Sequence, residues 1–164
     1  HRDIKPDNIL VTRELIPKIT DFGIARRPLS ELTGPLEILG TPAYMAPESF
    51  VSSATDHRAD IFSLGTLFYE LLVGNRPFEA DNIPQLARKI TDELPVEPRK
   101  IVPDLPPLLQ QVLARMLKKR PETRYVSAQD VVKDLDAFLL GASSSAADNL
   151  GNRLLAHVFG RNWS

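Results

Sequence analysis

The chain has 164 residues, and its 20 lysine and arginine residues against 21 aspartate and glutamate residues give a formal charge of −1. This balance excludes the broad basic surface with which a nucleic-acid-binding domain neutralises phosphates. A content of 43% hydrophobic and 25% charged residues indicates a globular domain with a core. The absence of cysteine excludes thiolate nucleophiles and disulfide frameworks, and we expect a cytoplasmic location.

The first predicted elements are two short strands at residues 8–11 and 18–20, which form a hairpin. After residue 48 the patterns are helical. Apolar residues between 60 and 73 lie on nearly all sides of a helix, which is typical of a central, buried helix. Gly74 is placed to end this helix. The fold class that we expect is therefore mainly α with a short β-hairpin.

Three more helices are predicted, at residues 81–93, 108–119 and 127–140, and Ser127 is the expected cap of the last one. The segment GASSSAAD that follows is typical of a linker. We therefore expect a domain at residues 1–140, then an Ala/Ser linker and a short amphipathic tail at residues 141–164. The tail is compatible with a membrane surface or a partner, and also with a frayed end or a helix packed on its own protein.

Three motifs follow one another within the first 48 residues: HRDIKPDN at 1–8, DFG at 21–23 and GTPAYMAPE at 40–48. In this order they resemble the signature of the eukaryotic-type serine/threonine protein kinases. The resemblance implies the C-terminal part of a kinase catalytic domain, a large-lobe fragment lacking the small lobe and the early large-lobe helices. The chain begins with histidine, and we expect it to be a segment of a longer protein, for which membrane anchoring stays open.

Moving a γ-phosphoryl group from ATP to a hydroxyl needs a proton acceptor, oxygen ligands for Mg²⁺ and positive charge near the phosphoryl oxygens. The resemblance implies that Asp3 is the proton acceptor and that Lys5 faces the γ-phosphate. It also implies that Asn8 and Asp21 are the Mg²⁺ ligands. Thr41 would bond near Asp3 and Lys5 in the wall that binds the substrate. The form of the loop around Lys5 and the presence of Thr41 favour Ser/Thr over Tyr as acceptor.

The resemblance also implies residues that hold the frame of the site. Asp60 would bind the backbone of the catalytic loop, and Glu48 would pair with Arg124. His1 would pack under Phe22 without a catalytic role.

The segment 21–48 would be the activation segment, with Ser30, Thr33 and Thr41 as its hydroxyl-bearing Ser/Thr residues after the DFG. Arg2 precedes the base, where a phosphorylated loop residue can pair with an arginine. We expect Thr33 to be the regulatory site.

The leading hypothesis is a serine/threonine protein kinase that uses ATP and Mg²⁺, acts on protein substrates and binds no nucleic acid. The form of the activation segment and of the linker favours a bacterial kinase. An alternative is a kinase-like module that docks proteins through residues 81–93 without catalysis. Intact Asp3, Asn8 and Asp21 favour the enzyme. Without the small lobe, we expect this segment alone to be inactive.

Overall fold

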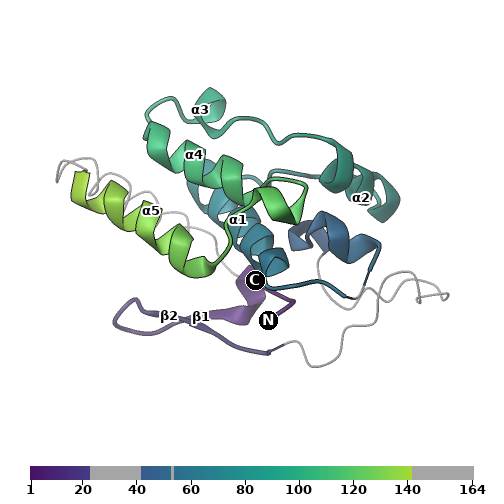
Figure 1. Cartoon of the computed structure of the whole chain (residues 1–164), viewed down its shortest axis with the longest axis horizontal. Coiled ribbons are helices and arrows are strands. Elements are labelled where there is room, and N and C mark those ends of the chain that lie inside the picture. The colour runs from purple at the N-terminus through teal and green to yellow at the C-terminus, as the bar shows by residue number, and fades with distance from the viewer. Residues whose placement is uncertain (23–41, 53, 142–164) are drawn as a thin grey trace.

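The computed structural model of the protein describes residues 1–22, 42–52 and 54–141. Within these ranges it has two strands and five α-helices (Figure 1), namely β1 (Ile9–Val11), β2 (Pro17–Ile19), α1 (Arg58–Val73), α2 (Ile83–Asp92), α3 (Pro98–Ile101), α4 (Pro107–Met116) and α5 (Ala128–Gly141). Short 3₁₀ helices precede β1 (η1, Pro6–Asn8), precede α1 (η3, Pro42–Tyr44, and η4, Pro47–Phe50) and precede α5 (η5, Pro121–Thr123). The mainly helical fold with one short hairpin is confirmed.

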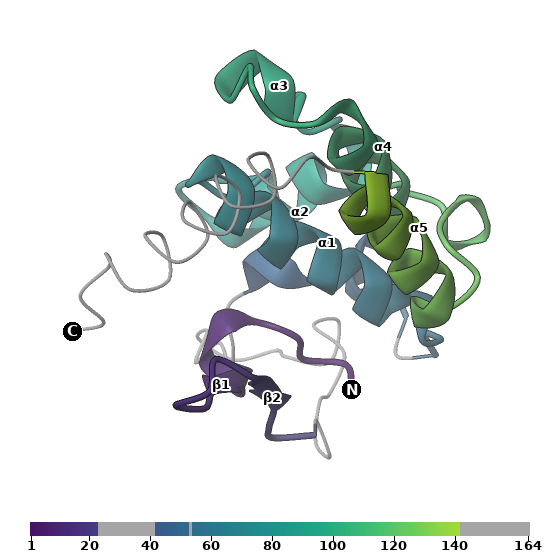
Figure 2. The ribbon, with the colours of Figure 1, turned by 90° about the vertical axis from the view of Figure 1, so that its left-hand side faces the viewer.

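The hairpin lies on one side of the helices (Figure 2). Its strands are antiparallel, and Ile9 is paired with Ile19. The predicted first strand was one residue too long, because Asn8 ends the turn η1 with its N–H bonded to the carbonyl of Lys5. The second strand begins one residue earlier than predicted, at Pro17, which is tolerated because a first strand residue at an edge needs no N–H.

The elements that surround the central helix α1 explain why it is apolar on nearly all sides. It begins at Arg58, two residues earlier than predicted, because the carboxylate of Asp56 accepts a hydrogen bond from the N–H of Arg58. One side packs against α4, and Phe62 is fully buried. Gly74 ends the helix as predicted, in the left-handed conformation at φ 95°, with its N–H bonded to the carbonyl of Glu70.

The other predicted helices are present with different limits. Asn82 caps α2 by accepting a hydrogen bond from the N–H of Gln85, so this helix begins at residue 83. Helix α4 ends at Met116, three residues before the predicted end. The four-residue helix α3 lies in the proline-rich connection, where we predicted none. Ser127 caps α5 as predicted, because its hydroxyl accepts from the N–H of Asp130.

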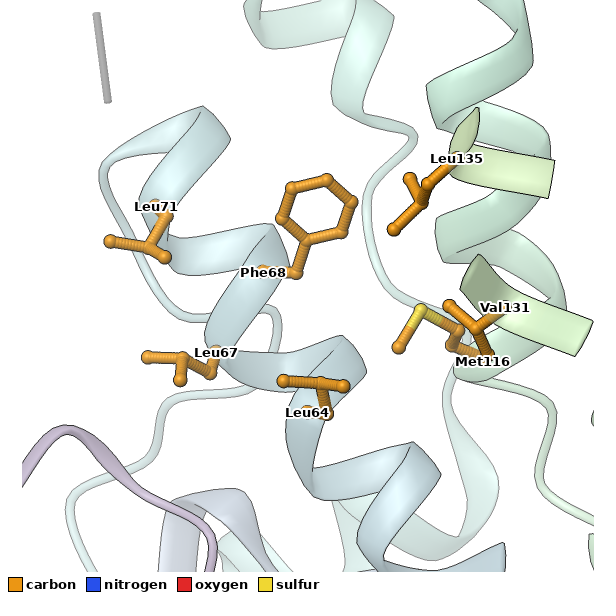
Figure 3. A pocket seen from close by; sticks show the side chains of 7 residues that line it. All are labelled: Leu64, Leu67, Phe68, Leu71, Met116, Val131 and Leu135. Carbon is orange, nitrogen blue, oxygen red and sulfur yellow. The ribbon is translucent and has the colours of Figure 1, made fainter. Parts of the chain in front are cut away.

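An apolar pocket opens between α1, α4 and α5 (Figure 3). Its lining consists only of apolar side chains, from Leu64, Leu67, Phe68, Leu71, Met116, Val131 and Leu135. Four of these are only half-buried, namely Leu135 on α5 and Leu64, Phe68 and Leu71 on one face of α1. None of the helices in the described ranges is long and apolar enough to cross a membrane.

Candidate active site

The loop at residues 1–8, which carries the HRDIKPDN motif and is called the catalytic loop below, is attached to the first turn of α1 through Asp60. One carboxylate oxygen of Asp60 accepts a hydrogen bond from the amino group of His1, and the other accepts from the backbone N–H of Arg2, each at 2.7 Å. Arg2 has φ 70°, in the left-handed region that a residue of its size rarely adopts. The two bonds from one rigid helix hold the loop in this strained conformation. The predicted contact of Asp60 with the loop backbone is confirmed.

Three of the predicted site residues come together within this loop. The ammonium Nζ of Lys5 lies 3.3 Å from Oδ2 of Asp3, and both side chains are largely buried. The amide Nδ2 of Asn8 donates to the backbone carbonyl of Asp3 at 2.8 Å, and Asn8 is 6% exposed. Because the amide nitrogen is used inside the loop, the amide oxygen of Asn8 is the atom that can serve as a metal ligand.

Asp21 follows the strand that pairs with the segment of Asn8. The N–H of Thr20 donates to the carbonyl of Asn8 at 2.9 Å, so the backbone of Asp21, the next residue, lies near Asn8. Its own φ is 55°, which turns the chain sharply after β2. The prediction that neighbouring strands bring Asn8 and Asp21 to the same region is confirmed for the backbone.

His1 connects the loop to the second strand. Its Nε2 donates to the carbonyl of Thr20 at 2.8 Å, and its Nδ1 accepts from the N–H of Asp3 at 3.3 Å. A neutral imidazole with its proton on Nε2 satisfies both bonds. The His1 ring also packs against the Phe22 ring, with centroids 4.8 Å apart. The predicted packing is confirmed, and the bonding of both ring nitrogens fits an architectural residue.

Thr41, and the predicted regulatory Thr33 with Ser30, lie outside the described residues. The segment that directly follows Thr41 is η3, and Tyr44 at its end is buried. The hydroxyl of Tyr44 donates to the carboxylate of Glu70 on α1. Burial is the main cause, and this hydrogen bond the second, that raises the pKa of Tyr44 far above its usual range, so the phenol stays a donor. Sequence reasoning missed this contact, because nothing in the motif indicates a partner on α1.

Glu48 and Arg124 form the predicted pair. Both carboxylate oxygens of Glu48 accept from the guanidinium of Arg124, at 2.6 and 2.7 Å. The remaining donors of Arg124 bind the backbone carbonyls of Arg58, Lys118 and Lys119. All five N–H groups of the arginine are therefore used. This arrangement fixes the end of the GTPAYMAPE segment to α1 and to the connection before α5.

The donor set fits the magnesium and phosphate end of a nucleotide. An amide oxygen from Asn8 and a carboxylate from Asp21 are the hard oxygen ligands that Mg²⁺ prefers, and this ion usually takes its remaining ligands from water and phosphates. Within the described ranges no three His, Cys, Asp or Glu side chains form a metal-binding group. The ammonium of Lys5 places a positive charge in the same loop, 3.3 Å from the carboxylate of Asp3.

A catalytic loop anchored on a buried helix, next to a hairpin that is followed by Asp21, defines the large lobe of a protein kinase. Residues 1–135 match the model of the protein kinase domain, so the chain belongs to the protein kinase family. The resemblance predicted from the three motifs is thereby confirmed.

The chain is similar to bacterial serine/threonine kinases. It is 36% identical over 137 residues to a probable serine/threonine-protein kinase of Clostridium perfringens, covering 83% of this chain and 20% of that protein. It is 37% identical over 154 residues to the serine/threonine-protein kinase PknE of Mycobacterium tuberculosis, covering 93% and 27%. It is 36% identical over 138 residues to PknB of Mycolicibacterium smegmatis, covering 82% and 22%. The chain thus spans between 20% and 27% of the length of these relatives.

Proposed function

We propose that the protein to which these residues belong transfers the γ-phosphoryl group of ATP to serine or threonine hydroxyls of proteins. The observation that carries the proposal is the arrangement of the catalytic loop. Asp3 lies beside the ammonium of Lys5 at 3.3 Å, and Asn8 binds the backbone carbonyl of Asp3 at 2.8 Å. The names of the bacterial relatives support the serine/threonine acceptor.

In the proposed reaction the substrate hydroxyl oxygen forms a bond to the γ-phosphorus, and the bond between this phosphorus and the β–γ bridging oxygen breaks. ADP leaves with the electron pair, and the hydroxyl proton moves to the carboxylate of Asp3. Lys5 stabilises the negative charge on the transferred group. Magnesium, when bound, neutralises the phosphate oxygens.

Further parts of the proposal concern the residues around this centre. Asn8 and Asp21 hold the magnesium, and Thr41 contributes to the wall that positions the substrate hydroxyl. Because the reaction consumes ATP, we propose that this domain works in the cytoplasm.

The test compares Asp3→Asn with Asp7→Asn in the full-length protein. Asp7 lies in the same loop but is exposed, so it is a matched control. We expect Asp3→Asn to lower turnover by about 10²-fold or more, with ATP binding retained, because a general base contributes on this scale to the rate. Asp7→Asn should keep turnover within a few fold. Asp21→Ala should also weaken Mg²⁺-dependent nucleotide binding.

The same experiment decides between the enzyme and the docking module. A full-length protein whose turnover survives Asp3→Asn within a few fold would contradict the proposed role of the loop. A full-length protein that binds substrates but shows no turnover in any form would favour the module.

We also propose that residues 1–164 expressed alone have no measurable kinase activity. The site residues assigned above serve the phosphate end of ATP and the substrate hydroxyl, and none of them is assigned to the adenosine end. Phosphoryl transfer depends almost entirely on positioning and electrostatics. An ATP/Mg²⁺ assay with a generic protein substrate tests this, with the Asp3→Asn chain as blank. Turnover clearly above the blank would show that these residues suffice.

A further inference from the structure

Lys119 links helix α2 to the rest of the domain, and the function proposed above gives it no role. Its ammonium Nζ donates to the backbone carbonyl of Ile90 at 2.6 Å. The same atom lies 4.0 Å from the centroid of the buried Phe78 ring. Ile90 is in the last turn of α2, where carbonyl groups have no partner within the helix. The carbonyl and the face of the ring therefore offset part of the cost of burying this ammonium.

The backbone of Lys119 is held by the buried arginine of the site. Its carbonyl accepts a hydrogen bond from Nη2 of Arg124 at 2.8 Å, and the same nitrogen binds Glu48 at 2.7 Å. Lys119 thus connects the end of α2 to the residue that anchors η4. Helix α2 also packs directly against η3 and η4. The segment that follows Thr41 is therefore connected to α2 both directly and through Arg124 and Lys119.

Two other side chains hold the region around α2, and each reaches a different point. The ammonium of Lys89 donates to the carbonyl of Glu79, which fixes the loop before the helix. The hydroxyl of Tyr69 donates to the carbonyl of Val96, which fixes the segment after it. Lys119 contributes the contact at the C-terminal turn of the helix.

We propose that Lys119 is a positioning residue for the protein substrate, because it links the last turn of α2 to Arg124, which anchors η4 in the segment that follows Thr41. This inference rests on the proposed kinase function and on the predicted role of Thr41. The nucleotide end of the site is held by a different attachment, from Asp60 to the catalytic loop. Loss of the Lys119 contact should therefore weaken the use of the protein substrate and leave the use of ATP unchanged.

The test is Lys119→Met in the full-length protein, which keeps much of the side-chain volume and removes the ammonium. We expect the KM for a generic protein substrate to rise about threefold to tenfold, with the KM for ATP unchanged, since one charge-assisted hydrogen bond is lost. Amide hydrogen exchange in the last turn of α2 should become about tenfold faster. Lys119→Arg, which keeps a cation, should restore part of the KM.

Lys118→Met is the matched control. Lys118 is the exposed neighbour, and its contact with Arg124 uses the backbone carbonyl, which the substitution keeps. Neither KM value nor the exchange of α2 should change in this variant.

Unchanged KM for the protein substrate in Lys119→Met would overturn the inference, as would an equal rise in both KM values, which is the mark of a general structural defect. If Lys119→Met does not fold, Phe78→Leu removes the ring face with Lys119 intact, and the same split between the KM values is expected. Turnover that survives Asp3→Asn would instead contradict the proposed function, whatever the exchange of α2 shows.

Discussion

Arg124 binds Glu48 through two parallel hydrogen bonds, although the two residues are 76 positions apart in the chain. The arginine side chain has no exposed surface, while that of the glutamate keeps 19%. A buried guanidinium without its carboxylate is an uncompensated charge in a medium of low polarity. The removal of one partner alone should therefore destabilise the fold strongly.

We expect Glu48→Ala to lower the free energy of unfolding by about 3–5 kcal/mol, because Arg124 stays buried and loses its counter-charge. Urea denaturation of the purified chain measures this. The control is Glu122→Ala, which removes an exposed partner of Arg120 and should change the free energy of unfolding far less. Equal effects of the two substitutions would show that the buried pair has no special weight.

At Gly65, α1 lies close against the end of α4. A Cβ atom at this residue would lie 2.8 Å from the Cβ of Met116 and 3.3 Å from a methyl carbon of Leu117. We expect Gly65→Ala to destabilise the chain by about 1–3 kcal/mol despite the higher helix propensity of alanine, because the two helices must move apart. Thermal unfolding measures the change.

Gly141→Ala is the control for the helix propensity alone. A Cβ at Gly141, the last residue of α5, would meet nothing within 4 Å. Its effect should lie between zero and a gain of about 1 kcal/mol. If Gly65→Ala were as mild as this control, the close packing of α1 on α4 would be in doubt.

The sequence was sufficient for the features that repeat or that belong to a motif. The apolar period located α1, α4 and α5, and the motif HRDIKPDN located Asp3, Lys5 and Asn8 in one loop. The limits of the elements were less predictable, because they depend on single hydrogen bonds. Asn8 belongs to a turn and not to a strand because its N–H finds the carbonyl of Lys5.

Single contacts between residues far apart in the chain could not be predicted from the sequence pattern. Lys119 binds a carbonyl 29 positions away, and any residue type would present the same carbonyl. Tyr44 and Glu70 are 26 positions apart, and neither has a periodic pattern that points to the other. The pairing of Glu48 with Arg124 was predicted only because the family resemblance implied it.

Thr66 has a buried hydroxyl without a hydrogen-bond partner in the part of the chain that the structure describes. We expect Thr66→Val to raise the free energy of unfolding by about 1 kcal/mol, because valine has the same shape and removes an unpaired polar group. Calorimetric unfolding measures this. Ser63→Ala is the control on the same helix, since the hydroxyl of Ser63 donates to the carbonyl of Ala59 and should show no such gain. A loss of stability in Thr66→Val would indicate that the hydroxyl has a partner.

Lys119 gives the domain a pH dependence in the alkaline range. Burial lowers the pKa of Lys119 to about 8, with a smaller contribution from Arg124, while Asp92 and Glu93 act in the opposite direction. A lysine in the unfolded chain has a pKa of about 10.4. Between these values the unfolded chain binds more protons at this residue than the folded chain, so the free energy of unfolding rises with pH. The cost of burying the ammonium is fully present below pH 8 and is relieved toward pH 10.

We therefore expect the free energy of unfolding of the unaltered chain, minus that of Lys119→Met, to increase by about 2 kcal/mol between pH 7.5 and 9.5. The window ends at pH 9.5 to avoid the titration of tyrosines at higher pH. Burial raises the pKa of Tyr44 and of Tyr125 above the value in the unfolded chain, so their titration makes the free energy of unfolding fall as the pH rises. Urea denaturation at several pH values measures both chains, and Lys118→Met should run parallel to the unaltered chain. A difference between the unaltered chain and Lys119→Met that stays constant with pH would mean that Lys119 keeps an ordinary pKa in the folded state, and that its ammonium is better hydrated than its position between Ile90 and Phe78 implies.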